Sequence, residues 1–516
     1  MKKILAVILT VLMALSLFSA CAGQTGELDT LVIRSYGDPM SFEPNVTADD
    51  FAYDIVQNLY NRLVKLDASK SVIPDLAESW DVSSDGLAIT FHLKQNAKWH
   101  DGKPVTSADV KYTYDTIKAT PEYFLSPNLA TVKSIEAPDE YTVVFNMETP
   151  DVPILGYLAW YASFVIPKHI FDNGQPWEDN PAGQDPIGSG PFKFVEHTPG
   201  VSTILEKNAD YHDGEPKMDR LVFSIIPDDM TAVQALINGE IDVLEMFPDA
   251  ELENLRRNDD IRLMLNEYPS PMYIAFNMDV APCNDQAFRT AFAMAVDRQE
   301  ICDKIYLGVR EPEISMYPAV VKWAANLVDT VPEFDIAGAR KVLEDAGYTL
   351  DSDGYFVRGV EIDIFEGYGF PETGKLLQAT LKEAGIELVL LVQEFNAWNQ
   401  KVFVDGDFIV EMQGGFQGPD PSALGSRVST NGSMNQSSYS NAEVDALFLE
   451  AAKIGDQQQR ADIFHQIQAI LAVELPILPL VNYAAYEAHR SNLKNLPIDG
   501  AGKWGWQEYT FTEFVK

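Results

Sequence analysis

The sequence is short of cysteine, of basic residues and of recognisable catalytic motifs. Three cysteines in 516 residues exclude a disulfide-stabilised scaffold. Only 38 Lys and Arg face 77 Asp and Glu, and the resulting net charge of −39 argues against nucleic acid and against adsorption on anionic lipid. Such a charge favours solubility and says little about the fold.

Motifs for enzymatic chemistry are also missing. The seven histidines never occur in H-x-H or H-E-x-x-H spacing, and there is no G-x-S-x-G elbow, P-loop or G-x-G-x-x-G. The acidic turn at 351–354 lacks the later ligands of a calcium loop and is predicted to be a plain turn. We therefore expect no enzyme activity, no cofactor and no metal, leaving open only a metal site assembled from distant histidines.

Long apolar runs are absent except at the start of the chain. Lys2 and Lys3 precede the apolar run 4–18, which ends in Ser19-Ala20-Cys21. A basic start, a short apolar run and small residues indicate a secretory signal over 1–20, and the run is shorter than the roughly 20 residues of a membrane-spanning helix. Without Lys2 and Lys3 the balance is 36 basic against 77 acidic residues, or about −41.

The cysteine after two small residues resembles a lipoprotein signal, in which Cys21 becomes the lipidated first residue of a tether over 21–26. In the alternative, the signal is an ordinary cleaved one and Cys21 has no role. The first interpretation predicts a protein outside the cytoplasmic membrane that is held to its outer face by lipid alone.

The rest of the chain is too long for one core of typical size, so two or three structural domains are expected. Strands that alternate with helices, with an antiparallel-looking insert at 61–185, predict an α/β architecture. A strand is expected at 31–33, a helix at 50–63, a hairpin at Asp85-Gly86, and a helix capped by Thr106 and Asp109.

Later helices show equally local signals. Asp285 and Asp335 are expected to cap helices, Gly347 and Gly385 to end them, and Ser440 with Glu443 to form a capping box. Were the stretch from Cys283 to Cys302 one continuous helix, the two sulfurs would lie about 25 Å apart, too far to bridge. Two free, partly buried thiols are therefore expected.

The segment 186–228 organises the chain. Gly188 and Gly190 are predicted to adopt backbone angles closed to other residues, and Pro191 to exclude a helix, so that the chain bends sharply before a strand. The turn G-S-G-P-F is followed by L-x-x-N-x-x-Y-x-x-G-x-P-x-x-D-x-L from residue 205.

This pattern resembles the solute-binding components of peptide and nickel ABC importers. The series P-x-L-A-x-S-W, D-G, F-x-L and W-H-D-G-x-P-V-T-x-x-D-V between residues 74 and 110 resembles the same family, and so do the segments 239–242 and 276–298. Within this resemblance His100-Asp101-Gly102 is a structural turn, not an acid–base pair, and Trp99 packs in the insert.

The resemblance implies a two-lobed, type II periplasmic-binding-protein-like fold of the large cluster with an extra inserted domain. Lobe I would comprise 27–60, 186–278 and 493–516, the insert 61–185 would pack on it, and 279–492 would form lobe II, with crossover strands near 182–190 and 270–280. The implied function is capture of a peptide or peptide-like solute between the lobes and delivery to ABC permease subunits, by a monomer.

The family resemblance also implies a cleft-lining loop at 413–422. Phe416 takes the place of an aromatic that packs on the ligand, and Asp420-Pro421 match a later D-P. The family's amine-binding Asp would stand three residues after Phe416, where this chain has Pro419. Either Asp420 substitutes for that carboxylate or it only caps the following turn, so a simple zwitterionic peptide is put in doubt.

Further cleft residues follow from the resemblance, each with ordinary packing as its alternative. They are Tyr36, Asp38, Met272, Tyr273, Trp398 and Arg427. Arg427 is either a partner for a ligand carboxylate or an exposed loop arginine. An oligosaccharide, chelated nickel, a sensory role in the same fold, and hydrolysis of peptides or glycans are the alternative functions.

Overall fold

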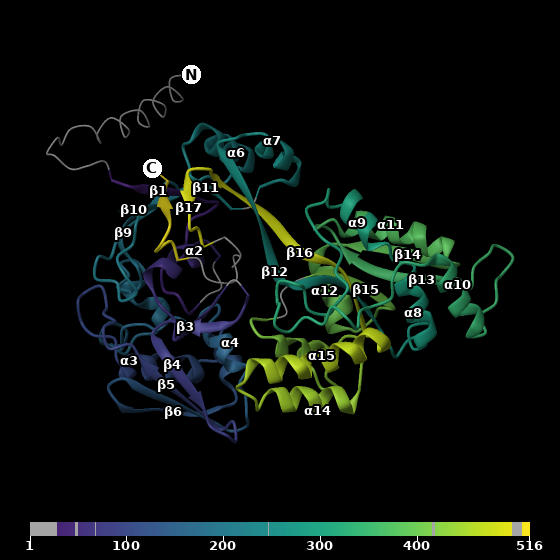
Figure 1. Cartoon of the computed structure of the whole chain (residues 1–516), viewed down its shortest axis with the longest axis horizontal. Coiled ribbons are helices and arrows are strands. Elements are labelled where there is room, and N and C mark those ends of the chain that lie inside the picture. Colours follow the sequence, from purple (N-terminus) through teal and green to yellow (C-terminus); the bar gives the residue numbers. More distant parts are fainter. Residues whose placement is uncertain are drawn as a thin grey trace.

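The computed structural model describes residues 28–46, 50–67, 69–245, 247–414, 418–497 and 508–515 (Figure 1). The predicted signal peptide, Cys21 and Phe416 lie outside these residues. Within them, no helix combines the length and the apolar character that crossing a membrane requires.

A ten-stranded sheet extends through both lobes in the order β14-β13-β15-β12-β16-β11-β1-β10-β9-β8. Its strands are β1 (Thr30–Ser35), β8 (Phe192–Thr198), β9 (Ser202–Lys207), β10 (Arg220–Ile225), β11 (Val243–Leu244), β12 (Ile261–Phe276), β13 (Val357–Phe365), β14 (Ile386–Gln393), β15 (Val410–Gly414) and β16 (Ile477–Arg490). Figure 1 shows two lobes joined by the long strands β12 and β16. The predicted two-lobed α/β fold is confirmed.

Lobe I holds one end of this sheet. β1 runs parallel to β10 and β11, whereas β8, β9 and β10 are antiparallel. Its helices are α2 (Asp50–Leu59), α6 (Asp229–Asn238) and α7 (Leu252–Arg256), and two short strands, β17 (Leu493–Lys494) and β18 (Glu513–Phe514), pair beside it. The predicted first strand and the helix starting at Asp50 are confirmed, although the helix ends four residues earlier than expected.

The insert is built on an antiparallel sheet in the order β4-β5-β7-β6. Its strands are β2 (Val64–Leu66), β3 (Val72–Pro74), β4 (Ala77–Val82), β5 (Ala88–Leu93), β6 (Val132–Asp139) and β7 (Thr142–Met147), and its helices are α3 (Ser107–Ala119), α4 (Ile154–Leu158) and α5 (Lys168–Phe171). Both the β4–β5 hairpin and the Thr106–Asp109 capping box before α3 are as predicted.

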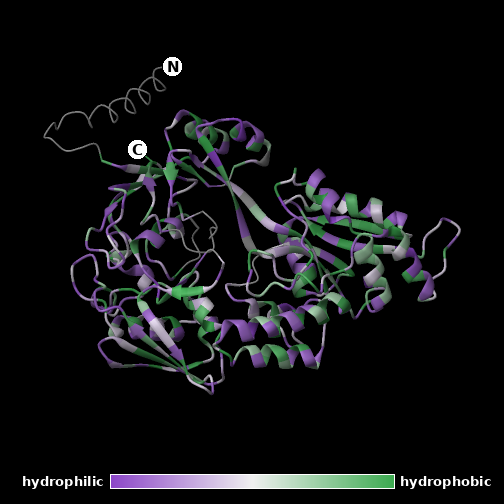
Figure 2. Cartoon of the chain, viewed as in Figure 1, coloured by the Kyte–Doolittle hydropathy of each residue, from purple (hydrophilic) through white to green (hydrophobic). Residues whose placement is uncertain are grey.

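Lobe II is an α/β unit in which β13 runs parallel to β14 and β15. Its helices are α8 (Gln286–Met294), α9 (Arg298–Lys304), α10 (Ile336–Asp345), α11 (Phe370–Glu383), α12 (Phe395–Asn399), α13 (Gly425–Val428), α14 (Ala442–Ala451) and α15 (Gln457–Glu474). Figure 2 shows hydrophobic residues along the strands of this lobe, and hydrophilic residues alternating with hydrophobic ones on the surrounding helices.

The buried residues form two large cores. One core joins lobe I to the insert, because Leu31 and Ile33 of β1 belong to the same cluster as Phe91 and Phe145 of the insert. The other core belongs to lobe II. The insert therefore packs as part of lobe I, whereas lobe II has a hydrophobic interior of its own.

The connection between the lobes differs in part from the prediction. β12 crosses near 270–280 as expected, but the second crossover is β16, not the segment 182–190. The ladder between β12 and β16 is interrupted twice, between Glu267 and Pro271 and between Met272 and Tyr273. These irregularities interrupt the pairing midway along the two connecting strands.

The turn at 186–191 packs inside lobe I for a reason that differs from the predicted one. Neither Gly188 nor Gly190 has a positive φ. A Cβ on Gly188 would lie 1.7 Å from the Leu59 carbonyl oxygen, and one on Gly190 would lie 2.6 Å from that of Asn58. Glycine is required here by close approach of another backbone segment, which the local sequence does not reveal.

His100 holds the same turn in place. Its Nδ1 accepts a hydrogen bond from the Gly188 N–H at 3.1 Å, so its Nε2–H donates to the Gly190 carbonyl at 3.0 Å. Burial lowers the pKa of His100 to about 4. The interpretation of 100–102 as a structural turn, with Trp99 buried beside it, is confirmed.

Most of the predicted caps in lobe II are correct. Asp285 and Asp335 cap α8 and α10, and Gly347 and Gly385 are left-handed. The box at Ser440 is wrong, because Asn441 caps α14 while the Ser440 hydroxyl bonds to Thr430. Two helices, α8 and α9, replace one continuous helix between Cys283 and Cys302. Both cysteines are free thiols as expected, although they are fully buried where partial burial was predicted.

Candidate ligand-binding site

The parallel strands of lobe II end at one edge of the sheet. β13 ends at Phe365, β14 at Gln393 and β15 at Gly414, and Met272 of the antiparallel β12 lies opposite Gly414. Ligands in open α/β sheets bind beyond the carboxyl ends of parallel strands, where loops bring side chains from several strands together. This edge is therefore the lobe II half of the candidate site.

An aromatic cluster covers the edge. Phe365 is central, with ring centroids at 4.7 Å from Trp398, 5.3 Å from Phe395 and 6.1 Å from Tyr368. Trp398 is buried, whereas Tyr368 is 56% exposed and Phe395 is 51% exposed. The exposed rings offer apolar faces for a solute, while the predicted Trp398 packs against Phe365 and, at 5.9 Å, against Phe395.

A cation lies next to these rings. The guanidinium of Arg310 is 4.1 Å from the Tyr306 ring centroid and 5.3 Å from that of Tyr483, and its Nη1 donates to the sulfur of Met272. The Tyr483 ring lies 6.1 Å from that of Tyr368. The aromatic surface of lobe II thus includes a positive charge held by cation–π contacts.

Tyr273 and Arg427 come together beneath the same edge. Arg427 Nε donates to the Tyr273 hydroxyl at 2.8 Å, and both side chains are buried, so Arg427 is not an exposed loop arginine. Burial raises the pKa of the neighbouring Glu411 to about 8, although Arg427 acts in the opposite direction. Glu411 Oε1 accepts from Gln413 Nε2 at 2.6 Å, while Oε2 has no hydrogen-bond partner among the described residues.

Asp420 is engaged within the protein. Its two oxygens accept from Arg460 Nη1 and Nη2 at 2.9 and 2.6 Å, and Oδ1 also accepts from the Ser422 N–H at 2.9 Å. Both members of this pair are buried. The alternative in which Asp420 caps the following turn is the one that the structure shows, and the carboxylate is already neutralised by Arg460.

In lobe I, a candidate pocket lies at the carboxyl ends of β1, β10 and β11. A pocket of about 330 Å³ is lined by Arg34, Tyr36, Asp229, Phe247 and Pro248. Arg34 Nη2 forms an ion pair with Asp229 Oδ1 at 2.6 Å, and its guanidinium lies 4.8 Å from the Tyr36 ring centroid. The predicted Tyr36 therefore lines a pocket together with a buried arginine.

Asp38 does not line this pocket. Both of its oxygens accept from the Gly200 N–H, at 2.8 and 3.0 Å, and His197 Nε2 lies 3.5 Å from Oδ1. Asp38 thus fixes the turn between β8 and β9. Its position gives no support for a contact with a solute.

A larger cavity, of about 550 Å³, lies between the insert and lobe II. The insert contributes Asp151, Pro153 and Tyr157, and lobe II contributes residues between Ser422 and Ala452. A hydrogen bond of 2.9 Å from the Val152 N–H to the Ala452 carbonyl connects the two sides. The insert and lobe II therefore touch at this seam, in addition to the link between lobe I and lobe II through β12 and β16.

Sequence reasoning missed Arg310, Tyr306, Tyr368 and Tyr483. Tyr368 stands in the glycine-bounded turn G-Y-G directly after β13, so its place at a strand end was visible in the sequence. Arg310 and Tyr306 are only four residues apart, but their place in the cluster depends on contacts with Tyr483 and Tyr368, which lie 173 and 62 residues away. No local pattern marks them.

Two lobes joined by a pair of long strands, with loops at the carboxyl ends of the strands in each lobe, are the architecture of two-lobed solute-binding proteins. The model of the bacterial extracellular solute-binding proteins, family 5, matches residues 71–436. The chain belongs to this family. Relatives of the chain include an oligopeptide-binding protein, a heme-binding protein and an ABC transporter substrate binding protein, so the family is one of substrate-binding transport proteins.

Similar proteins agree with this assignment. The oligopeptide-binding protein AppA of Bacillus subtilis is 28% identical over 92% of this chain and 92% of its own. HbpA2 from Haemophilus parasuis matches with a TM-score of 0.86 at 27% identity, over 94% of this chain and 99% of its own. The unliganded open form of MppA, a periplasmic murein tripeptide binding protein, matches with a TM-score of 0.83 at 22% identity, over 95% and 98%.

Proposed function

We propose that the protein captures a peptide or peptide-like solute between lobe I and lobe II and delivers it to an ABC importer. The aromatic cluster beside Arg310, at the carboxyl edge of lobe II, is the observation that carries this proposal. Exposed aromatic rings bind an extended, partly apolar chain, and a neighbouring cation binds a carboxylate or backbone carbonyl.

The proposed ligand set keeps most of the predicted residues and gains two. Tyr36, Met272, Tyr273, Trp398, Phe416 and Arg427 stay in the set, joined by Arg310 and Tyr368. Asp38 and Asp420 leave it, because their oxygens are engaged by Gly200 and Arg460. Arg427 uses Nε and Nη1 for Tyr273 and Met434, and a guanidinium has further N–H donors for a ligand carboxylate.

The same set lacks a carboxylate for a ligand's amino terminus. Asp420 is paired with Arg460, and Glu411 is buried beneath the edge. A buried ammonium without a partner costs several kcal/mol. We therefore propose that the solute has a modified or distant amino terminus, and that unmodified short peptides bind weakly.

Binding would close the lobes about β12 and β16. Four solved relatives in complex with a peptide or with Ni(L-His) match this chain with TM-scores of 0.69 to 0.71, below the 0.83 of the open form. This difference supports an open arrangement that a solute would draw shut by binding the closed state more tightly. The division proposed is lobe I over 27–60, 186–278 and 493–516, the insert over 61–185, and lobe II over 279–492.

Native mass spectrometry of the protein purified from its own host tests the proposal. We expect a co-purifying peptide-like mass, and a decrease in radius of gyration by solution scattering when that solute is added to stripped protein. If the co-purifying mass were an oligosaccharide or a nickel complex, the proposed ligand class would be wrong. If the purified protein cleaved a peptide library, the proposed transport function would give way to hydrolysis. A nanomolar affinity for an unmodified dipeptide in calorimetry would contradict the missing amine partner.

Membrane attachment through Cys21 is a separate proposal, supported by the small residues Ser19 and Ala20 before it. Lipidation at this position would hold a monomer on the outer face of the membrane, beside its permease. Cys21→Ala is expected to release the protein into the soluble fraction or the medium. Full membrane retention of this variant would contradict lipid anchoring, and a docking histidine kinase in place of a permease would indicate sensing.

A further inference from the structure

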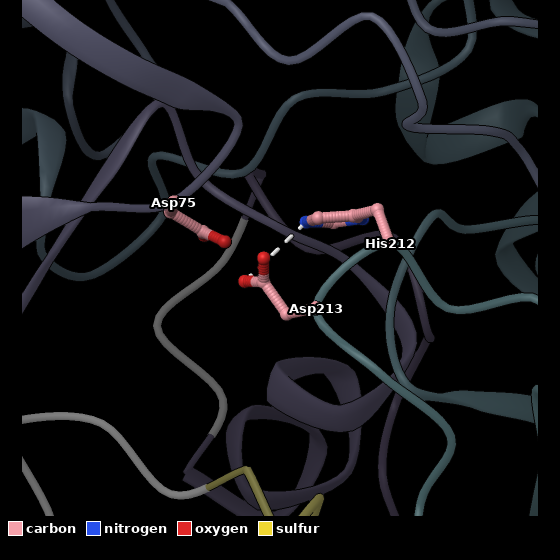
Figure 3. Close-up of side chains that lie close together, drawn as sticks. All are labelled: Asp75, His212 and Asp213. Atoms are coloured by element: carbon pink, nitrogen blue, oxygen red, sulfur yellow. Dashed lines mark ion pairs between the residues drawn. The ribbon is translucent and has the colours of Figure 1, made fainter.

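Three potential metal ligands come together at the junction of the insert with lobe I. Asp75 directly follows β3 of the insert, and His212 and Asp213 belong to the loop between β9 and β10 of lobe I. One ligand atom from each lies within 4.8 Å of the other two (Figure 3). These residues take no part in the proposed solute site.

The histidine nitrogen supplies the second observation. The His212 side chain is 1% exposed, and its Nε2 has no hydrogen-bond partner among the described residues. Asp213 Oδ2 lies 3.7 Å away, which is too long for a hydrogen bond. Figure 3 shows the ring edge directed at the two carboxylates. A buried polar atom without a partner is costly, so this orientation requires an explanation.

Both carboxylates are oriented by neighbours outside the group. Asp75 accepts from Asn61 Nδ2 at 2.9 Å and from the Arg62 N–H at 2.7 Å. Lys94 Nζ holds Asp213 Oδ1 at 2.5 Å, which leaves Oδ2 facing His212. Outer partners of this kind fix the direction of metal ligands, and an ionised carboxylate accepts more than one bond per oxygen.

We propose that Asp75, His212 and Asp213 bind a divalent transition-metal ion of the zinc class, with water completing the coordination. One imidazole and two carboxylates suit zinc, whereas magnesium and calcium prefer oxygen ligands alone. Two donors at about 2.1 Å from a tetrahedral ion are about 3.4 Å apart, close to the separation of His212 from Asp213. Because the three ligand atoms lie within 4.8 Å of one another, the most distant pair would have to approach by at most about 1.4 Å on binding the ion.

The charges around the three residues determine the expected affinity for the metal ion. Lys94 neutralises part of Asp213, and Lys65 lies 3.5 Å from Glu508 in the same neighbourhood. Because these lysines oppose a cation, we expect binding in the micromolar range, weaker than in closed four-ligand structural sites. A bound ion would tie the insert to lobe I, so its effect would be on stability and not on solute affinity.

Zinc titration of the full-length soluble protein, stripped with a chelator and dialysed, tests the site. We expect one equivalent of Zn²⁺ to bind, and the melting temperature to rise. His212→Gln and Asp213→Asn should each weaken zinc binding at least tenfold. His169→Gln is the matched control, because His169 Nε2 also lies close to an aspartate, 2.8 Å from Asp101 Oδ2, but at a more exposed site.

The outcomes separate clearly. Loss of the equivalent in both site variants but not in His169→Gln supports the proposal, and so does an anomalous zinc peak between the three side chains. Equal zinc binding by all variants, or no binding by the wild type at 100 μM Zn²⁺, roughly a hundredfold above a micromolar Kd, overturns it. Circular dichroism confirms that each variant is folded, and solute binding is measured separately, so that failure of the two proposals is distinguishable.

Discussion

Aromatic side chains have different roles in the two halves of the molecule, of which one is lobe I together with the insert and the other is lobe II. In lobe I, aromatic side chains such as Trp99 and Phe145 are buried in a core shared with the insert, and the turn at Gly188 is locked beneath another segment. In lobe II, the aromatic cluster reaches the sheet edge and leaves Tyr368 and Phe395 half exposed. The aromatic residues of lobe I and the insert thus mainly stabilise a shared core, whereas those of lobe II also form an accessible surface.

The largest loss of stability is expected from a substitution at Gly188 in lobe I. Gly188→Ala would place a Cβ 1.7 Å from the Leu59 carbonyl, so we expect lobe I and the insert to lose more than about 5 kcal/mol and to fail to fold together. Gly174→Ala is the control, because Gly174 has a positive φ but no atom within 4 Å of the added Cβ, and it should cost about 1 kcal/mol. Similar urea midpoints for the two variants would refute the close-approach argument.

Asp420 tests lobe II. Asp420→Asn breaks a buried ion pair and leaves Arg460 uncompensated, so we expect a loss of about 3 to 5 kcal/mol in unfolding free energy. Thermal melting of the wild type and the variant, with and without solute, measures both the loss of stability and the remaining solute binding. If stability stayed unchanged while solute binding disappeared, Asp420 would be a ligand group after all.

The lowered pKa of the buried His100 side chain makes the stability of the protein depend on pH. Its folded pKa is about 4, below the ordinary 6.5, so the unfolded chain takes up a proton first as the pH falls. Stability should therefore be full above pH 6.5 and decrease toward pH 4, with about 1 to 2 kcal/mol lost at pH 5. His100→Asn keeps an acceptor near Gly188 and should flatten this part of the pH profile. An unchanged profile would show that other groups dominate.

The smallest effect on stability is expected at Tyr368. Because the ring is half exposed, Tyr368→Ala should change the unfolding free energy by less than about 1 kcal/mol. The lost aromatic contact should weaken binding of the solute identified by mass spectrometry roughly tenfold. Tyr355→Ala, in the turn beside Arg358, is the control and should leave binding unchanged. Equal binding by both variants would remove the aromatic cluster from the site.

The sequence predicted what is local and missed what is distant. Thr106 with Asp109 and Asp285 were assigned correctly because a cap and its helix are adjacent in the chain. The predicted cap of α14 at Ser440 was wrong by one residue, because the Asn441 side chain accepts from the free N–H groups at the start of the helix. The partners of Asp38 and Asp420 lie 162 and 40 residues away, so their engagement could not be predicted.

The interrupted ladder between β12 and β16 has a mechanical consequence. Met272 and Tyr273 flank one of the two breaks, and both belong to the proposed ligand set. In the proposed closure, a bound solute would contact the same peptide units about which the two lobes would rotate, so no chain of distant side chains would be needed to couple binding to closure. The residues that bind the solute and the residues at which the connecting strands bend would then be the same.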